Sequence, residues 1–258
     1  MANKGKLIDL NCDMGESFGP YKLGYDEEVS RYITSANVAC GFHAGDPMWM
    51  AHTVSLCLKN GVGIGSQPSY PDLLGFGRRK MDCTPEEIKN YIKYQTGSLM
   101  GFVKGGKLQH VKPHGALYNT AAVDPKLAVA IAEAVLEMDP SLIMAVLAGS
   151  KAEEAVRKTG VRFARECFAD RAFNPDGTLV SRSLPGSVIH DVNQVVERSI
   201  LMVTEGKVKA VDGSIVEFEP DTICLHGDTP GAVDLAKAIR TGLEKAGVKV
   251  KPMGAFVK

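Results

Sequence analysis

Residues 124–148 read Asp-Pro-Lys-Leu-Ala-Val-Ala-Ile-Ala-Glu-Ala-Val-Leu-Glu-Met-Asp-Pro-Ser-Leu-Ile-Met-Ala-Val-Leu-Ala, and this stretch decides the fold class. Asp124 places a side-chain acceptor before a proline, which needs no backbone donor at the first position of a helix. The helix that follows sets Leu127, Ile131 and Val135 on one apolar stripe. The unbroken apolar run of residues 142–148 is typical of a parallel strand covered on both faces. Together they predict a helix packed on a parallel sheet.

The same alternation of short apolar runs and helical segments repeats along the chain, which is the signature of βα units around parallel strands. Two more helices are expected to begin at Asp46-Pro47 and at Thr84-Pro85, and Thr84 forms a capping box with Glu87. The predicted strands number seven: Leu7–Leu10, Asn37–Phe42, Val62–Ser66, Leu108–Lys112, Leu142–Ala148, Val161–Cys167 and Thr222–His226. We therefore expect an α/β fold in which seven parallel strands form a (β/α) barrel.

No Pro-, Gly- or Ser-rich linker divides the chain, so a single (β/α)-barrel domain over residues 1–258 is expected. One insertion breaks the rhythm near residues 207–218. There Val208–Val211 and Ser214–Phe218 flank Asp212-Gly213, a two-residue hairpin signal. We expect this small β-hairpin to lie away from the site.

Composition limits the classes of function. The chain has 258 residues, of which 45% are hydrophobic, with 30 Lys and Arg against 30 Asp and Glu. The formal charge of zero gives no basic field of the kind that gathers nucleic acid. No stretch approaches a membrane span, and the first apolar run is too brief for a signal peptide. Six scattered cysteines without a CxxC pair are typical of reduced thiols, so a cytoplasmic location is expected.

Reactive side chains follow the predicted strands in unusual number. In an α/β barrel the loops after the strands converge on one face and build the active site there. The residues concerned are Asn11, Asp13, Glu16, His43, Asp46, Gln67, Tyr70, Asp72, Lys112, His114, Glu166, Asp170, Arg171, His226 and Asp228. A closed barrel would bring these groups around one pocket, and that convergence is the central expectation.

Taken singly, some of these residues also have a purely structural interpretation. Asp46, Asp124 and Asp228 follow the pattern of helix caps. The neighbouring Asp170 and Arg171 could form only an ion pair. The structural interpretation does not explain why His43, His114 and His226 all lie at strand ends.

The string His110-Val-Lys-Pro-His114 has the spacing of two metal ligands on one helical turn. Pro113 and the apolar run before it argue against a helix there. In an extended chain His110, Lys112 and His114 share one face instead, so all three are expected to line the barrel mouth. A cation and an imidazole in that place suit the stabilisation of an oxyanion or a phosphate.

No nucleotide-binding fingerprint is found in the sequence. Residues 101–107 match the glycine spacing of a phosphate loop, but Leu108 stands where Ser or Thr must hold magnesium, and the segment ends a helix. A GxSxG elbow is absent as well, which argues against a serine hydrolase of that kind.

Four long motifs occur in order along the chain: Asp9-Leu-Asn-Cys-Asp-Met-Gly-Glu16, Ser35-Ala-Asn-Val-Ala-Cys-Gly-Phe-His-Ala-Gly-Asp46, Val111-Lys-Pro-His-Gly-Ala-Leu-Tyr-Asn119 and Leu225-His-Gly-Asp228. Shorter ones are Tyr70-Pro-Asp72, Gly75-Phe-Gly-Arg-Arg79, Ala148-Gly-Ser150 and Phe168-Ala-Asp-Arg171. Together they resemble the LamB/YcsF family, the A subunit of prokaryotic 5-oxoprolinase, over nearly the whole length.

The resemblance implies a distorted seven-stranded barrel like that of glycoside hydrolases and deacetylases. It also implies ATP-dependent hydrolysis of 5-oxo-L-proline (pyroglutamate) to L-glutamate, carried out with partner subunits B and C. The family usually shows Gly-Ala-His-Pro where this chain has Gly65-Ser-Gln-Pro68. Gln67 cannot shuttle protons at neutral pH and is a poor ligand for transition metals, which weakens a metal site or an acid/base role at that position.

ATP is a sensible source of activation, because amide resonance makes an unstrained lactam a poor electrophile and an amine is a poor leaving group. We expect ATP as a cosubstrate bound mainly by the partner subunits, which would handle much of the phosphoryl transfer. In this chain Asp13 or Glu16 would be the general base on water. Lys112, His114 and His43 would stabilise the developing negative charge, and Arg171 would hold the substrate carboxylate. The other expected substrate-binding residues are Asn11, Tyr70, His226 and Asp228.

Two other functions fit the same residues. In the first, Asp13, His43 and His114 grip a divalent metal that activates water, and the chain is an amidohydrolase or deacetylase acting alone. In the second, the chain is a non-catalytic subunit that presents substrate to its partners. The density of acids and imidazoles at strand ends favours a catalytic role.

Overall fold

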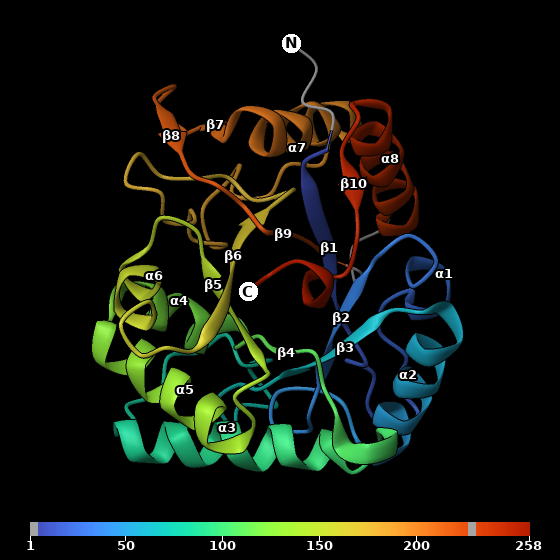
Figure 1. The fold of residues 1–258 in the computed structure, drawn as a ribbon, viewed down its shortest axis with the longest axis vertical. Helices are drawn as coiled ribbons and strands as arrows, with labels where there is room; N and C mark the ends of the chain where they lie inside the picture. Colours follow the sequence, from blue (N-terminus) through green and yellow to red (C-terminus); the bar gives the residue numbers. More distant parts are fainter. Residues whose placement is uncertain (1–4, 227–230) are drawn as a thin grey trace.

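The barrel closes in the computed structural model, which describes residues 5–226 and 231–258 (Figure 1). Its parallel strands are β1 (Leu7–Met14), β2 (Ser35–Ala39), β3 (Gly63–Gln67), β4 (His110–Val111), β5 (Ile143–Leu147), β6 (Arg162–Phe168) and β9 (Thr222–Leu225). They pair in that order, and β9 also pairs with β1, so the seven strands form a closed ring. The predicted seven-stranded parallel barrel is confirmed.

Helices surround these strands, as Figure 1 shows. They are α1 (Asp26–Val29), α2 (Pro47–Asn60), α3 (Pro85–Met100), α4 (Gly115–Val123), α5 (Pro125–Met138), α6 (Lys151–Val156), α7 (Val192–Glu205) and α8 (Ala232–Lys245). The predicted starts are confirmed: Asp46 caps α2, Thr84 closes a capping box on α3, and Asp124 caps α5. Each cap accepts backbone N–H groups that a helix end leaves unpaired, so these starts are set locally.

The remaining elements are short. Strands β7 (Lys207–Lys209) and β8 (Ile215–Glu217) pair antiparallel at the place of the expected hairpin. β10 (Lys249–Val250) adds to the amino end of β1, and 3₁₀ turns span Lys104–Gly106 (η1) and Met253–Ala255 (η2). Among the described helices, none combines the length and apolar character that crossing a bilayer requires. All six cysteines are free thiols, and five are buried.

Strand β1 alternates between an apolar and a polar environment. Its residues at 8, 10, 12 and 14 belong to the hydrophobic core outside the barrel wall, while Asp9, Asn11 and Asp13 hydrogen-bond to side chains of other strands inside the barrel. The prediction that the strand ends at Leu10 was therefore wrong, because it continues to Met14. Polar inward-facing side chains broke the apolar run and concealed the end of the strand.

Other strand boundaries shift for similar reasons. Strand β6 spans Arg162–Phe168, so Glu166, which we counted among the residues after a strand, lies within it, as the predicted bounds of residues 161–167 already required. Strand β2 begins at Ser35 and ends at Ala39, earlier than predicted, because the chain turns at Gly41 with a φ of 92°. These shifts leave the order of the strands unchanged, and the extension of β1 places Asn11 and Asp13 in the barrel interior instead of in a loop.

Candidate active site

A cavity of about 800 Å³ opens at the carboxyl ends of the strands. The predicted site residues that line it are Asp13, Glu16, Lys112, His114, Arg171 and His226. Its other walls come from helix α4 and from residues 174–184, which follow β6. These residues come together on one face of the barrel, whereas their chemical roles stay predictions.

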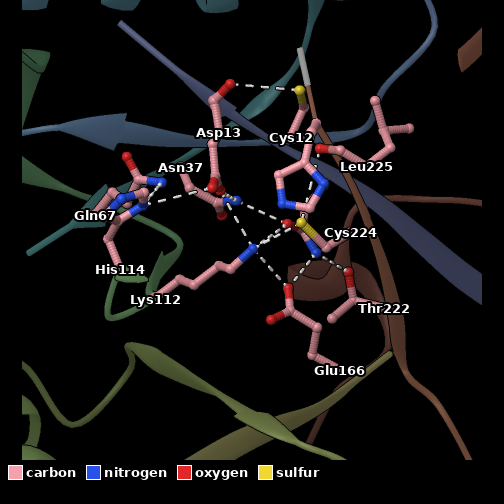
Figure 2. A network of polar contacts seen from close by, with 12 residues as sticks. Cys12, Asp13, Asn37, Gln67, Lys112, His114, Glu166, Thr222, Cys224 and Leu225 are labelled. Atoms are coloured by element: carbon pink, nitrogen blue, oxygen red, sulfur yellow. Dashed lines mark hydrogen bonds and ion pairs between the residues drawn. The ribbon is translucent and has the colours of Figure 1, made fainter. Parts of the chain in front are cut away.

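Lys112 lines this cavity and forms its charged floor. Figure 2 shows the polar contacts of Lys112. Its Nζ lies 2.9 Å from Glu166 Oε1 and 3.3 Å from Asp13 Oδ1. The same nitrogen donates to Asn11 Oδ1 at 3.1 Å and contacts Cys224 Sγ at 2.9 Å. Strands β1, β6 and β9 supply these partners, so one ammonium group ties together distant parts of the barrel wall.

The charge states of this floor follow from burial and from neighbouring charges. Burial alone would raise the pKa of the Asp13 carboxyl, but Lys112 and His114 hold that pKa well below its usual range. Burial likewise lowers the pKa of the Lys112 amine, yet the acidic groups around it, Asp13 foremost, raise it well above its usual value. At neutral pH Asp13 is therefore an anion and Lys112 a cation, and each fixes the position of the other.

A further layer of polar residues lies beneath the floor. Asn37 Nδ2 donates to Asp13 Oδ1 at 2.8 Å, and Asn37 Oδ1 lies 2.7 Å from His110 Nε2. Burial lowers the pKa of His110 to about 3, so this imidazole is neutral. His110 is fully buried. The expectation that it lines the barrel mouth was therefore wrong. Gly65 leaves room for its ring, since a Cβ there would lie 2.3 Å from His110 Nε2.

Two buried imidazoles stand beside the floor and are joined through Gln67. The rings of His43 and His114 stack with their centroids 4.1 Å apart. Gln67 Oε1 lies 3.2 Å from His43 Nε2, and Gln67 Nε2 lies 3.0 Å from His114 Nδ1. Glu16 Oε1 lies 3.9 Å from each of these imidazole nitrogens. Burial holds the pKa of His43 well below its usual range, so that ring is neutral.

His114 is held from its other side by a strained turn. Phe76 has a φ of 55°, and its carbonyl oxygen lies 3.1 Å from His114 Nε2. Because a carbonyl can only accept, Nε2 of His114 carries a hydrogen and donates it. Left-handed backbone at a residue with a side chain costs energy and is typical of functional sites. The strain is therefore located at a residue that orients a cavity-lining imidazole.

Another wall carries a carboxylate and an imidazole in contact. His226 Nδ1 lies 2.8 Å from Asp170 Oδ2, and His226 Nε2 lies 2.6 Å from Arg182 Nη2. A guanidinium can only donate, so Nε2 accepts and Nδ1 carries the hydrogen. Burial would raise the pKa of Asp170, but its contact with His226 lowers it. Asp170 thus fixes the tautomer of His226.

Arg171 lines the cavity, but its guanidinium is engaged by the chain itself. Its Nε donates to the carbonyl of Ser187 at 3.2 Å and its Nη2 to that of Val180 at 2.5 Å. Burial lowers the pKa of Arg171 to about 10. These bonds tie the loop after β6 to the end of the strand, so the Arg171 guanidinium is occupied within the chain.

Several predicted site residues do not line the cavity. Asn11 lies beneath the floor, where its Nδ2 donates to Glu166 Oε1 at 2.8 Å. His43 is fully buried beside Gln67, and Tyr70 packs in the hydrophobic core. Asp228 lies outside the described residues. Direct substrate contact therefore lacks support for Asn11, His43 and Tyr70.

Two of the acidic residues that follow predicted strands have purely structural partners. Asp46 caps α2, which is the structural alternative considered for it, and Asp72 pairs with Arg79. Conversely, three residues line the cavity that the sequence analysis did not single out: Arg78, Tyr118 and Arg182. Arg78 and Tyr118 lie within recognised motifs, so a signal existed, whereas Arg182 lies in a loop without any pattern.

One group of described residues offers donor atoms close enough to share a metal ion, namely Glu16, His43 and His114, whose ligand atoms lie within 4.8 Å of one another. Asp13, expected in such a set, lies beside it, with Oδ2 3.6 Å from His114 Nδ1. Both inward-facing nitrogens are hydrogen-bonded to the Gln67 amide. The group therefore does not fit an ion while that amide is in place.

The chain matches the model of the LamB/YcsF family over residues 8–258. It is 58% identical to a protein from Pyrococcus furiosus that is named as the A subunit of 5-oxoprolinase, over 97% of this chain and 99% of that one. The crystal structure of a lactam utilization protein from Thermus thermophilus aligns with a TM-score of 0.89 at 46% identity, covering 95% of this chain and 98% of that one. The Bc1960 peptidoglycan N-acetylglucosamine deacetylase shares the fold, with a TM-score of 0.52 at 10% identity, covering 100% and 90%.

Proposed function

The chain belongs to the LamB/YcsF family, and we propose that it is the A subunit of a 5-oxoprolinase. In this function it hydrolyses 5-oxo-L-proline to L-glutamate with ATP as cosubstrate and with subunits B and C as partners. One observation carries the proposal: carboxylates, an ammonium group and imidazoles meet in one cavity of a chain that is 58% identical to a protein of that name.

Opening the lactam needs an electrophilic carbon and a nitrogen that can leave. Phosphorylation of the amide oxygen by ATP supplies the first. Water then adds to the amide carbon, the ring C–N bond breaks, and the nitrogen leaves with a proton. A second water hydrolyses the remaining acyl phosphate and releases phosphate and glutamate. The residues of this chain have to activate water and stabilise the negative charge that develops on the oxygen atoms bonded to the reacting carbon.

We assign the general base to Glu16. Of the two candidate carboxylates, Asp13 has a pKa held well below its usual range, which makes it a weak base although it is reliably ionised. Glu16 lines the cavity, with its Oε1 3.9 Å from His114 Nδ1. Asp13 then serves to hold the Lys112 ammonium group in place.

Lys112 faces the cavity as a cation beside these carboxylates, and His114 lines the cavity next to Glu16. Donors fixed in a buried site stabilise developing negative charge more than the same groups do in water, because no reorganisation is needed. His43, which does not line the cavity, supports His114 by ring stacking. We therefore assign charge stabilisation to Lys112, and to His114 contact with the substrate beside Glu16.

The substrate carboxylate is assigned to Arg182. Its Nη2 lies 2.6 Å from His226 Nε2, and the side chain is exposed at the cavity wall. Arg171, the residue expected from the sequence, already donates to two backbone carbonyls. A guanidinium fork matches a carboxylate in geometry, which favours Arg182 for this role.

Phosphoryl transfer is assigned to the partner subunits, because the sequence lacks a phosphate loop. The test is to assay glutamate release from 5-oxoproline by this chain with subunits B and C, with and without ATP. Glu16→Gln should lower turnover by about 10²–10⁴-fold. Glu205→Gln, an exposed change at the end of α7, is the matched control and should not.

Release that does not depend on ATP would contradict the proposed reaction. Full turnover by Glu16→Gln, Asp13→Asn and His114→Ala would indicate a subunit that only presents substrate. Deacetylation of an N-acetyl sugar by the chain alone, with stoichiometric divalent metal, would favour the metal-dependent amidohydrolase instead.

A further inference from the structure

We propose that the side-chain amide of Gln67 takes the place of a metal ion among Glu16, His43 and His114: it links the two imidazoles and keeps a divalent cation out. Gln67 is thereby a positioning residue, which acts on the reaction through His114. Only this catalytic part rests on the proposed function.

The hydrogen bonds through Gln67 all donate in one direction, from His43 through Gln67 and His114 to the carbonyl of Phe76. His114 Nε2 donates to the carbonyl of Phe76, so in the neutral ring Nδ1 is an acceptor. The Gln67 NH₂ group, 3.0 Å from that nitrogen, is the donor it needs. The Gln67 carbonyl then faces His43 Nε2 at 3.2 Å and accepts its hydrogen. Figure 2 shows Gln67 and His114 meeting beside Asp13 and Lys112.

The Nδ1 atom of His43 is consistent with these donor and acceptor assignments. With its hydrogen on Nε2, His43 has a bare Nδ1, and that atom is buried with no hydrogen-bond partner among the described residues. Gln67 and His43 are both fully buried, so water does not reach them easily. A buried amide with opposite ends on two imidazoles is satisfied at both ends, and it fixes both rings.

The spacing of the donor atoms also favours an amide over an ion. Zinc–nitrogen and zinc–oxygen bonds of about 2.0–2.2 Å place tetrahedral donors roughly 3.4 Å apart. Glu16 Oε1 lies 3.9 Å from His43 Nε2 and from His114 Nδ1, and the three ligand atoms all lie within 4.8 Å of one another. Removing the Gln67 amide would free both imidazole nitrogens and leave space for the set to contract around an ion.

The experiment is a Co²⁺ titration of the purified chain, followed by the d–d absorption of tetrahedral cobalt. The natural chain should take up no stoichiometric Co²⁺. Gln67→Ala should take up about one equivalent, because the two imidazole nitrogens then lose their bonds to the amide and Glu16 Oε1 lies 3.9 Å from each of them. Gln67→Ala combined with His43→Ala should lose that site, and Gln194→Ala, an exposed glutamine of α7, should behave as the natural chain.

A second variant keeps the test decisive if Gln67→Ala does not fold. Gln67→Glu preserves the size of the side chain and places a carboxylate between the imidazoles, so it should also bind Co²⁺. In the reconstituted complex both variants should lower kcat by about tenfold to hundredfold, with KM little changed, as for loss of a residue that orients an active group.

Stoichiometric Co²⁺ in the natural chain would overturn the proposal. Folded Gln67 variants that bind no Co²⁺ would overturn it as well, and unchanged kcat would overturn the positioning role. The cobalt readout needs no substrate, so it distinguishes this proposal from failure of the 5-oxoprolinase assignment.

Discussion

The ammonium nitrogen of Lys112 lies 2.9 Å from Glu166 Oε1, with the two side chains only 4% and 0% exposed. Asp13 Oδ1 lies 3.3 Å from the same nitrogen, so one buried cation serves two buried carboxylates. Removing one member of such a group leaves the others uncompensated at low dielectric, and that costs far more than the net stability of the intact group.

Lys112→Met keeps the length of the side chain and removes its charge. We expect the free energy of unfolding to fall by about 3–5 kcal/mol, because Asp13 and Glu166 then repel each other in the barrel interior. Urea unfolding at neutral pH measures the change. Lys158→Met, at an exposed lysine after α6, should stay within about 0.5 kcal/mol of the natural chain. Equal losses in the two variants would contradict this account.

Asp26 links the stability of the chain to pH. Its Oδ2 accepts from the backbone N–H of Gly15 at 2.8 Å, and burial raises its pKa to about 6. An unfolded aspartate has a pKa of about 3.9, so between these values the folded chain holds a proton that the unfolded chain has lost. This stability is fully present below about pH 4 and is lost as the pH rises through 6.

Asp26→Asn keeps an acceptor oxygen for Gly15 and never carries charge. We expect the variant to match the natural chain near pH 4 and to exceed it at pH 7 by up to about 3 kcal/mol. Denaturant unfolding at both pH values measures the difference. Asp9, whose pKa burial also raises to about 6, contributes equally to both proteins and cancels. A difference that does not change with pH would show that Asp26 is not the titrating group.

The barrel and its helix starts could be predicted because local rules decide them. Apolar runs marked all seven strands, and the Asp or Thr before each proline marked its helix. The strand ends could not be predicted, because Asn11 and Asp13 point into a polar interior and resemble loop residues. A period of two was present there, but the sequence alone does not show that the inside of this barrel is polar.

The sequence predicted which residues form the candidate site better than it predicted how deep in the barrel each of them lies. Strand-end position indicated which side chains gather on the carboxyl face, but depth depends on packing between strands. Asn11 and His43 therefore lie under or behind the cavity, while Lys112 lines it. Arg182 comes from a loop whose path is set by contacts such as the bond from Arg171 to Val180, which no local pattern encodes.

Asp170→Asn should weaken substrate binding through His226. An asparagine NH₂ facing His226 Nδ1 would move the ring hydrogen to Nε2. Two N–H donors, His226 Nε2 and Arg182 Nη2, would then face each other and their hydrogen bond would be lost. Loss of a charge-assisted contact of about 1.5–3 kcal/mol raises KM about tenfold to hundredfold, with kcat less affected. Steady-state kinetics of the reconstituted complex measure this. Asp212→Asn in the hairpin turn should change neither constant, and a fall in kcat alone for Asp170→Asn would contradict the assignment.

Gly77 holds the turn that packs against both imidazoles. Its φ is 64°, and a Cβ there would lie 2.3 Å from Ser69 Oγ, 2.9 Å from His43 Cβ and 3.1 Å from His114 Cδ2. Gly105 makes a matched control, because its φ is 75° and nothing lies within 4 Å of an added Cβ.

Both substitutions by alanine carry a backbone strain of about 1–2 kcal/mol. Gly77→Ala should lose a further 1–3 kcal/mol or so, because the new methyl group must displace Ser69 and the imidazoles. It should also lower glutamate release, since His114 moves with its neighbours, whereas Gly105→Ala should leave release unchanged. Urea unfolding and the coupled assay measure the two effects. Equal losses of stability in both variants, with turnover intact, would show that the turn does not position His43 and His114.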